Sequence, residues 1–148
     1  MPHVRQSIRD NVVTAVTSLS TTGSNVHRTR VYPLESGDLP GLCVYANSEA
    51  SEVDILSGTR SLNRTADIVV EAYVRATANY DNTLDTICGE VEAALATDVT
   101  RGGKAKDTTL IATEIEYSDE AGDRPIGIAR MTFSVMYRTA INNATNAL

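Results

Sequence analysis

The feature that most constrains the fold lies between residues 65 and 98, where the spacing of apolar side chains changes from two residues to a helical repeat. Residues 65–76 alternate, which predicts a strand with one face formed by Ile68, Val70, Ala72 and Val74. Residues 82–98 predict an amphipathic helix whose stripe is Leu84, Ile87, Cys88, Val91 and Leu95. A chain with this change of period packs a helix on a sheet.

The ends of the helix and the second face of the strand add detail. Asp81 is a plausible N-cap, and Gly102 with Gly103 marks the end of the helix. On the second face of the strand, Val69 and Tyr73 accompany polar residues. This face is therefore expected to have a cover of its own, and another subunit is one candidate.

The remaining elements are read in the same way. Apolar spacing predicts a helix over residues 2–19, and strands over residues 26–34, 42–46, 108–117 and 125–138. In the strand over 108–117, one face carries Ile111, Ile115 and Tyr117. Residues 47–64 form either a long hairpin that turns near Ser57 and Gly58 or a mobile loop, and the hairpin is favoured because long structureless loops are uncommon. Residues 139–148 carry no charged side chain and predict a flexible tail or a docking arm.

The order of these elements predicts the fold class. Strands joined by short connections favour antiparallel pairing. We expect an α+β two-layer sandwich, with a mostly antiparallel sheet of four to five strands and two amphipathic helices on one face. The 148 residues match one domain, with the flexible tail beginning at about residue 139.

Composition and charge exclude several classes of protein. The longest apolar run, at residues 42–46, is far shorter than the roughly 20 residues of a spanning helix. The first ten residues lack the apolar core of a signal peptide, so a cytoplasmic location is expected. The formal charge of −6, with 13 scattered Lys and Arg, disfavours a nucleic-acid clamp. Cys43 and Cys88 are expected to be buried free thiols.

No motif points to catalysis, a metal or a cofactor. The acidic residues Glu114, Glu116, Asp119, Glu120 and Asp123 lack the spacing of a calcium loop, so a solvated hairpin is favoured. The sequence GGK at residues 102–104 follows a helix, unlike a phosphate loop. His3 and His27 lie in no recognisable catalytic motif, although distant residues could still assemble a site.

The basic residues gather in two stretches. One comprises Arg28, Arg30, Arg60, Arg64 and Arg75, and the other comprises Arg101, Lys104 and Lys106. They form either a solvated surface or a patch that pairs with acidic residues, such as SDEAGD at 118–123, on a neighbouring copy. A heterologous ring uses two different patches of this kind in each subunit.

Taken in order, four stretches resemble the tail terminator proteins of long-tailed bacteriophages, which are also called minor tail or tail completion proteins. They are QSIRDNVVTAVTSL, YPLESGDLPGLCVYANSE, TADIVVEAYVRATANYDNTLDTICGEVEAAL and TEIEYSDEAGDRPIGIARMTFSVMYRT. The resemblance covers nearly the whole chain and is weakest over residues 47–64 and 139–148.

This resemblance implies a structural virion protein without enzymatic activity or cofactor. Members of the family form a hexameric ring at the head-proximal end of the tail, where the ring caps the tail tube and ends its polymerisation. The implied partners are other copies of the chain, the tail tube protein and the head-side connector or neck protein. Double-stranded DNA passes through the lumen without specific binding, which an acidic chain suits. No membrane partner is implied.

The long polar connections and the C-terminal tail supply the expected contacts. The candidate residues for subunit or tube interfaces are Glu49, Glu52, Arg60, Arg64, Asp119, Glu120, Asp123 and Arg124. Three other functions stay open: a different head–tail joining protein, a non-enzymatic adaptor module, and an enzyme built on distant carboxylates.

Overall fold

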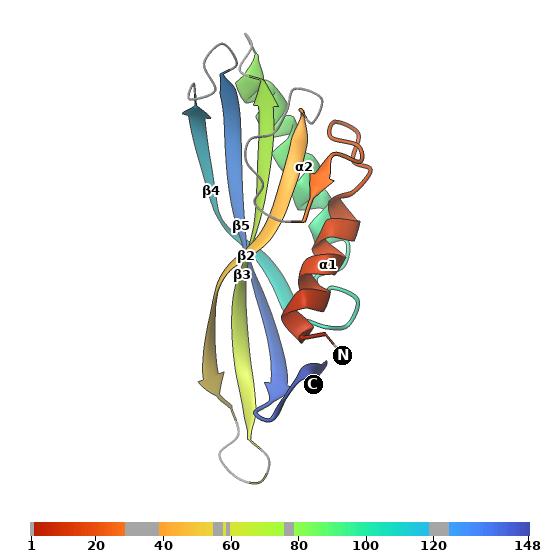
Figure 1. Cartoon of the computed structure of the whole chain (residues 1–148), viewed down its shortest axis with the longest axis vertical. Coiled ribbons are helices and arrows are strands. Elements are labelled where there is room, and N and C mark those ends of the chain that lie inside the picture. The colour runs from red at the N-terminus through yellow and green to blue at the C-terminus, as the bar shows by residue number, and fades with distance from the viewer. Residues whose placement is uncertain (1, 29–38, 55–57, 59, 76–78, 119–124) are drawn as a thin grey trace.

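The computed structural model describes residues 2–28, 39–54, 58, 60–75, 79–118 and 125–148. Its central feature is a six-stranded sheet (Figure 1). The strands are β1 (Val26–His27), β2 (Gly41–Val53), β3 (Ser61–Arg75), β4 (Asp107–Ser118), β5 (Ile126–Ala140) and β6 (Asn143–Ala147). Their order is β1-β2-β3-β5-β4, with β6 paired to β5 beside this path. Only the β1–β2 pair is parallel among the described pairs, so the predicted antiparallel sheet is confirmed, with one strand more than expected.

Two helices complete the fold. Helix α1 (Val4–Val16) contacts β1, β2 and β6, whereas α2 (Tyr80–Ala96) contacts β3, β4 and β5. The two helices also contact each other, and each follows a different part of the sheet (Figure 1). The chain is therefore an α+β fold, as predicted.

One hydrophobic cluster forms the core. It includes the predicted stripe of α2 without exception, and Val4, Ile8 and Val12 of α1. The strands contribute alternate residues, all of which point to one face, which we call the core face. The core face includes Leu42, Val44, Ile68, Val70, Met131 and Phe133. The opposite face, called the outer face, carries a smaller cluster of Cys43, Tyr73 and Ile128, against which Leu39 and Ile126 pack.

The hairpin interpretation of residues 47–64 is confirmed. β2 and β3 pair antiparallel from Gly41↔Tyr73 to Val53↔Leu62. The turn expected at Ser57 lies outside the described residues, and Gly58 has a φ of 68°. The β3–β5 ladder is longer still, because it runs from Ser61↔Ala140 to Arg75↔Ile126. The predicted strand over 26–34 is described only as β1, since residues 29–38 lie outside the described part.

The C-terminus differs from the flexible tail that we expected from residue 139. β5 continues to Ala140, and Asn143–Ala147 then folds back as β6. Thr139 pairs with Ala147, and the Leu148 N–H donates to the carbonyl of Arg138 at 2.9 Å. The short apolar and amide side chains of this segment allow it to add to the sheet, where backbone hydrogen bonds hold it.

Two local expectations are also corrected. The N-cap of α2 is Asn79, whose side chain makes no capping hydrogen bond. Asp81 lies instead in the first turn, where the positive end of the helix dipole stabilises its negative charge. On β4, Ile111 sits at a register shift between Leu110 and Ala112, so it does not continue the row of Ile115 and Tyr117. The cause is a bulge, which the apolar pattern does not reveal.

Candidate interaction surfaces

Glu49, from the half of β2 that leads into the hairpin turn, lies at the centre of a polar cluster. Its Oε2 accepts from Arg5 Nη1 at 2.8 Å and from Arg64 Nη1 at 3.2 Å. Its Oε1 accepts from the hydroxyl of Tyr137, and burial together with this carboxylate raises the pKa of that phenol. The side chains of Glu49 and Arg64 are only 11% and 12% exposed. These contacts join α1, β2, β3 and β5.

Arg64 is held from several sides. Its Nε donates to Thr139 Oγ1 at 3.0 Å, and its guanidinium carbon lies 5.9 Å from the centre of the Tyr137 ring. A planar guanidinium that stacks and pairs in this way fixes the relative positions of its strands. The structure therefore brings Glu49 and Arg64 together, as parts of the molecule's interior framework.

The other two candidates near this hairpin have a different environment. Glu52 and Arg60 are both exposed, and the Arg60 carbonyl accepts from the Ile141 N–H at 2.8 Å. Their charged groups are available to a partner. The remaining candidates, Asp119, Glu120, Asp123 and Arg124, lie outside the described residues. The described strand ends that flank this segment, Ser118 of β4 and Ile126 of β5, lie at the end of the sheet opposite to Val53 and Ser61 (Figure 1).

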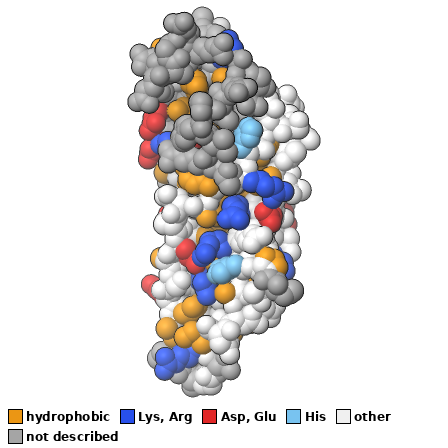
Figure 2. Space-filling view, in the orientation of Figure 1, with side chains coloured by type: hydrophobic (Ala, Val, Ile, Leu, Met, Phe, Trp, Pro, Cys, Tyr) orange, Lys and Arg blue, Asp and Glu red, His pale blue; other side chains and the backbone are white. Residues whose placement is uncertain are grey.

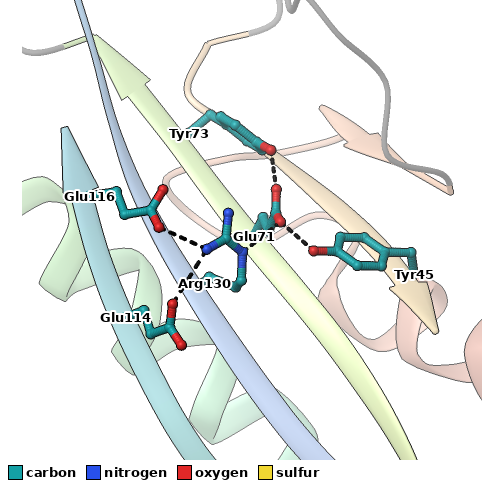
Figure 3. Close-up of polar contacts among 6 residues, drawn as sticks. All are labelled: Tyr45, Glu71, Tyr73, Glu114, Glu116 and Arg130. Carbon is teal, nitrogen blue, oxygen red and sulfur yellow. Dashed lines mark hydrogen bonds and ion pairs between the residues drawn. The ribbon is translucent and has the colours of Figure 1, made fainter. Parts of the chain in front are cut away.

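A second polar cluster lies on the outer face (Figure 3). The carboxylate of Glu71 on β3 is fully buried and accepts from Arg130 Nε at 2.9 Å, and it also accepts from the hydroxyls of Tyr45 and Tyr73. Burial alone raises the pKa of Glu71, but these donors outweigh burial, and the net pKa lies below the ordinary value.

Arg130 links this buried carboxylate to the sheet edge. Its Nη1 donates to Glu116 at 3.0 Å and to Glu114 at 3.5 Å, both on β4 (Figure 3). The hydrogen bond to Glu71 is the largest cause of a raised Arg130 pKa. Sequence reasoning missed the role of Glu71, although a single acid between Val69 and Tyr73 on a mostly apolar strand was the available signal.

The predicted basic stretches separate into surface and buried residues. Arg28 is exposed and pairs with Asp10 at 2.7 Å. Arg101, by contrast, is 1% exposed, and its Nη2 donates to the carbonyls of Leu95 and Asp98 at the end of α2. Arg101 therefore satisfies carbonyl groups at a helix C-terminus and is not part of a solvated basic patch. Lys104 and Lys106 are exposed, as a basic surface requires.

Of the two histidines considered for catalysis, His27 has a buried Nε2 without a hydrogen-bond partner among the described residues, whereas His3 has a structural role. His3 Nδ1 accepts from the Arg5 N–H at 3.0 Å, so this ring caps α1. Cys43 and Cys88 are buried and form no disulfide, as predicted. Among the described residues there is no group of three or more His, Cys, Asp or Glu side chains that could hold a metal ion. In the same part of the chain, neither helix has the length and apolar character needed to cross a membrane.

Comparison with known proteins agrees with this arrangement. A protein-family model described as phage minor tail protein U matches residues 3–137, which include every element except β6 and the end of β5. A search of curated proteins found no match. Because the family model spans most of the chain, this protein belongs to the phage minor tail protein U family.

Proposed function

We propose that this chain is a structural protein of the virion tail that forms a hexameric ring on the last ring of the tail tube. The ring ends tube polymerisation and presents a surface to the head-side connector. The observation that carries this proposal is the family match over residues 3–137. The same match supports a structural role, and we propose that the chain has no enzymatic activity.

The shape and charge of the chain support the proposal. The candidate contacts divide between two ends of a long sheet, with Glu52 and Arg60 near one end and the strand ends Ser118 and Ile126 at the other. A subunit with distinct surfaces at its two ends suits a ring that contacts a tube on one side and a connector on the other. The net charge of −6 suits a lumen through which DNA slides, since like charge prevents tight binding.

The genetic test is to remove the gene for this chain from its phage and to measure the lengths of the tails that form. Loss of a terminator leaves tube growth unchecked, so tails longer than those of the wild type are expected, and the wild-type gene supplied in trans restores their length. Normal-length tails that fail to join heads would contradict termination and favour a different head–tail joining protein. Normal particles would favour an adaptor outside the virion.

The biochemical test is the mass of the purified protein in solution. Six copies of a 15.9 kDa chain weigh about 95 kDa, in a closed ring of the kind that heterologous contacts generate. Light scattering should give this mass, and negative-stain images should contain rings that bind one end of purified tail tubes. Rings that never bind tube ends would speak against capping.

A further inference from the structure

One edge of the molecule is rich in acidic side chains. This edge, which we call the acidic edge, consists of α2 and of β4, the last strand in the sheet order. Neither element contains a Lys or Arg. Their charged residues are Asp81, Asp85, Glu90, Glu92, Asp107, Glu114 and Glu116. Glu90 accepts hydrogen bonds from Thr21 near α1, and the exposed Lys104 and Lys106 lie in the chain between α2 and β4. Arg130 reaches Glu114 and Glu116, but it also pairs with Glu71, so three carboxylates share one cation.

The opposite edge has the opposite balance. This basic edge consists of α1, β1 and the residue that follows β1. Arg5, Arg9 and Arg28 lie here, where Arg28 pairs with Asp10 and Arg5 pairs with Glu49 of β2. The side chains of Arg28 and Arg5 are 62% and 36% exposed. Figure 2 shows Lys and Arg side chains gathered over the middle of the visible face, where α1 and β1 lie, and acidic side chains at the left margin near β4.

The acidic edge also exposes apolar side chains. Ile115 and Tyr117 pair with Ala129 and Gly127 of β5, so they point to the core face, yet they are 53% and 56% exposed. Nearer the start of β4, a cavity of about 270 Å³ between α2 and β4 is lined by Glu92, Leu95, Val99, Leu110 and Phe133. The helix layer thus leaves the core face of β4 uncovered. Contiguous exposed apolar surface with a polar rim is typical of an interaction site.

Both edges offer unpaired backbone groups. β4 pairs only with β5 among the described strands, so its other side presents free N–H and C=O groups. At the other edge of the sheet, β1 pairs only with Leu42 and Cys43 of β2. The part of β2 from Glu49 to Val53 therefore has no described strand on the side away from β3. Long unpaired edges are templates for contact with another chain.

We propose that the acidic edge of one copy docks on the basic edge of the next copy. The charges are complementary in this arrangement, whereas two acidic edges would repel each other. The contact joins two different patches of the same chain, and repeated contacts of this kind close into a ring when the rotation allows it. The inference rests on the proposed function, because the proposed ring supplies the second copy that occupies each edge. It adds which two surfaces of the chain meet, which the proposed function does not specify.

The test uses charge reversal on each edge. The acidic-edge variant carries Asp85→Lys, Glu92→Lys and Glu114→Lys. The three native side chains are exposed, two of them on α2 and the third on β4. The basic-edge variant carries Arg9→Glu and Arg28→Glu. For each variant alone, the dissociation constant of self-association should be at least about tenfold higher than for the wild type. Each variant should therefore remain monomeric at concentrations at which the wild type associates. An equal mixture should associate again, because it restores both the native and the swapped charge pairs. Asp67→Lys makes the same change of sign on β3, between the two edges, and should not weaken association.

The outcomes separate this inference from the proposed function. Light scattering of the full chain across protein concentration and salt should give a wild-type mass that falls as salt rises, because surface charges are screened. If the wild type associates and both reversal variants associate equally well, the assignment of the edges is wrong and the ring stands. If the wild type stays monomeric up to about 1 mM, docking between copies is overturned, and the tail-length experiment alone then decides the proposed function. Circular dichroism confirms that each variant is folded.

Discussion

Arg130 and Glu71 are directly opposite each other in the β3–β5 ladder, and the Arg130 Nε donates to the buried Glu71 carboxylate at 2.9 Å. This pair connects the interior of the outer face to the acidic edge, because the same guanidinium reaches Glu114 and Glu116. A fully buried carboxylate is tolerated only when it is paired and hydrogen-bonded. The pair therefore makes the stability of the sheet depend on pH.

Replacing Glu71 with Gln should destabilise the fold by roughly 3 kcal/mol at neutral pH, because Arg130 loses its buried partner. Folding lowers the pKa of Glu71 below its ordinary value of 4.5. Its contribution is therefore complete above that value and is lost as the pH falls through the folded-state pKa. Urea unfolding from pH 7 down to about pH 3 should show a shallower loss of stability in the variant than in the wild type.

Glu114→Gln is the matched control for this experiment. The Glu114 carboxylate is 66% exposed and lies 3.5 Å from the same guanidinium. An exposed pair contributes little, so the expected change is below about 1 kcal/mol. Equal pH profiles for Glu71→Gln and the wild type would contradict the role of the buried carboxylate.

Glu49 and Glu52 should behave differently, although they are three residues apart on β2. Glu49→Gln removes the partner of Arg5, Arg64 and Tyr137 and should cost about 2 kcal/mol, since Arg64 and Tyr137 are largely buried. Glu52→Gln alters an exposed side chain and should stay within about 0.5 kcal/mol. Urea midpoints of the two variants measure the difference. Equal losses of stability in the two variants would contradict the distinction between the largely buried Glu49 and the exposed Glu52.

Gly127 is required by the first turn of α2. A Cβ at this position would lie 2.9 Å from Tyr80 Cε2 and 3.4 Å from Leu84 Cδ1. Gly127→Ala should therefore destabilise the protein by about 1–3 kcal/mol through overpacking. In a double-mutant cycle, Tyr80→Ala should relieve much of this cost, and thermal unfolding of the four proteins measures the coupling. Additive effects would rule out the contact as the cause.

Reversing Asp119 and Glu120 to Lys tests the acidic residues that follow β4. We expect weaker ring or tube assembly while the monomer stays folded, because these residues are candidates for an interface and not for the core. Light scattering and tube-binding assays measure assembly, and circular dichroism measures folding. The isosteric pair Asp119→Asn and Glu120→Gln should have a smaller effect. Wild-type assembly by the reversed variant would remove these residues from the interface.

Local periodicity was sufficient to predict the elements that form the core. Leu84, Ile87, Cys88, Val91 and Leu95 are all buried, and the alternating residues of β3 all join the same cluster. These predictions succeed because helices and strands have fixed repeats, so the side chains on one face can be read directly from the sequence. The long hairpin was predicted on a different ground, because long structureless loops are uncommon in a compact domain.

The candidate site was less accessible to sequence reasoning. Glu49 and Arg64 were chosen as contact residues, yet they meet each other across β2 and β3 with little exposure. Arg101 was assigned to a basic surface but lies buried at the end of α2. Which side chains face each other depends on strand order and register, and these follow from contacts between residues far apart in the chain.

The sequence by itself determined the class of fold, the positions of both helices, the long β2–β3 hairpin and the absence of basic residues from α2 and β4. These properties depend on residue type and local repeat. The tertiary structure alone decided that Glu71 is buried beside Arg130, that the C-terminus pairs with β5, and that Ile115 and Tyr117 remain exposed on a face that is buried elsewhere. Burial depends on which elements cover a residue, and the cover is supplied by segments that are distant in sequence.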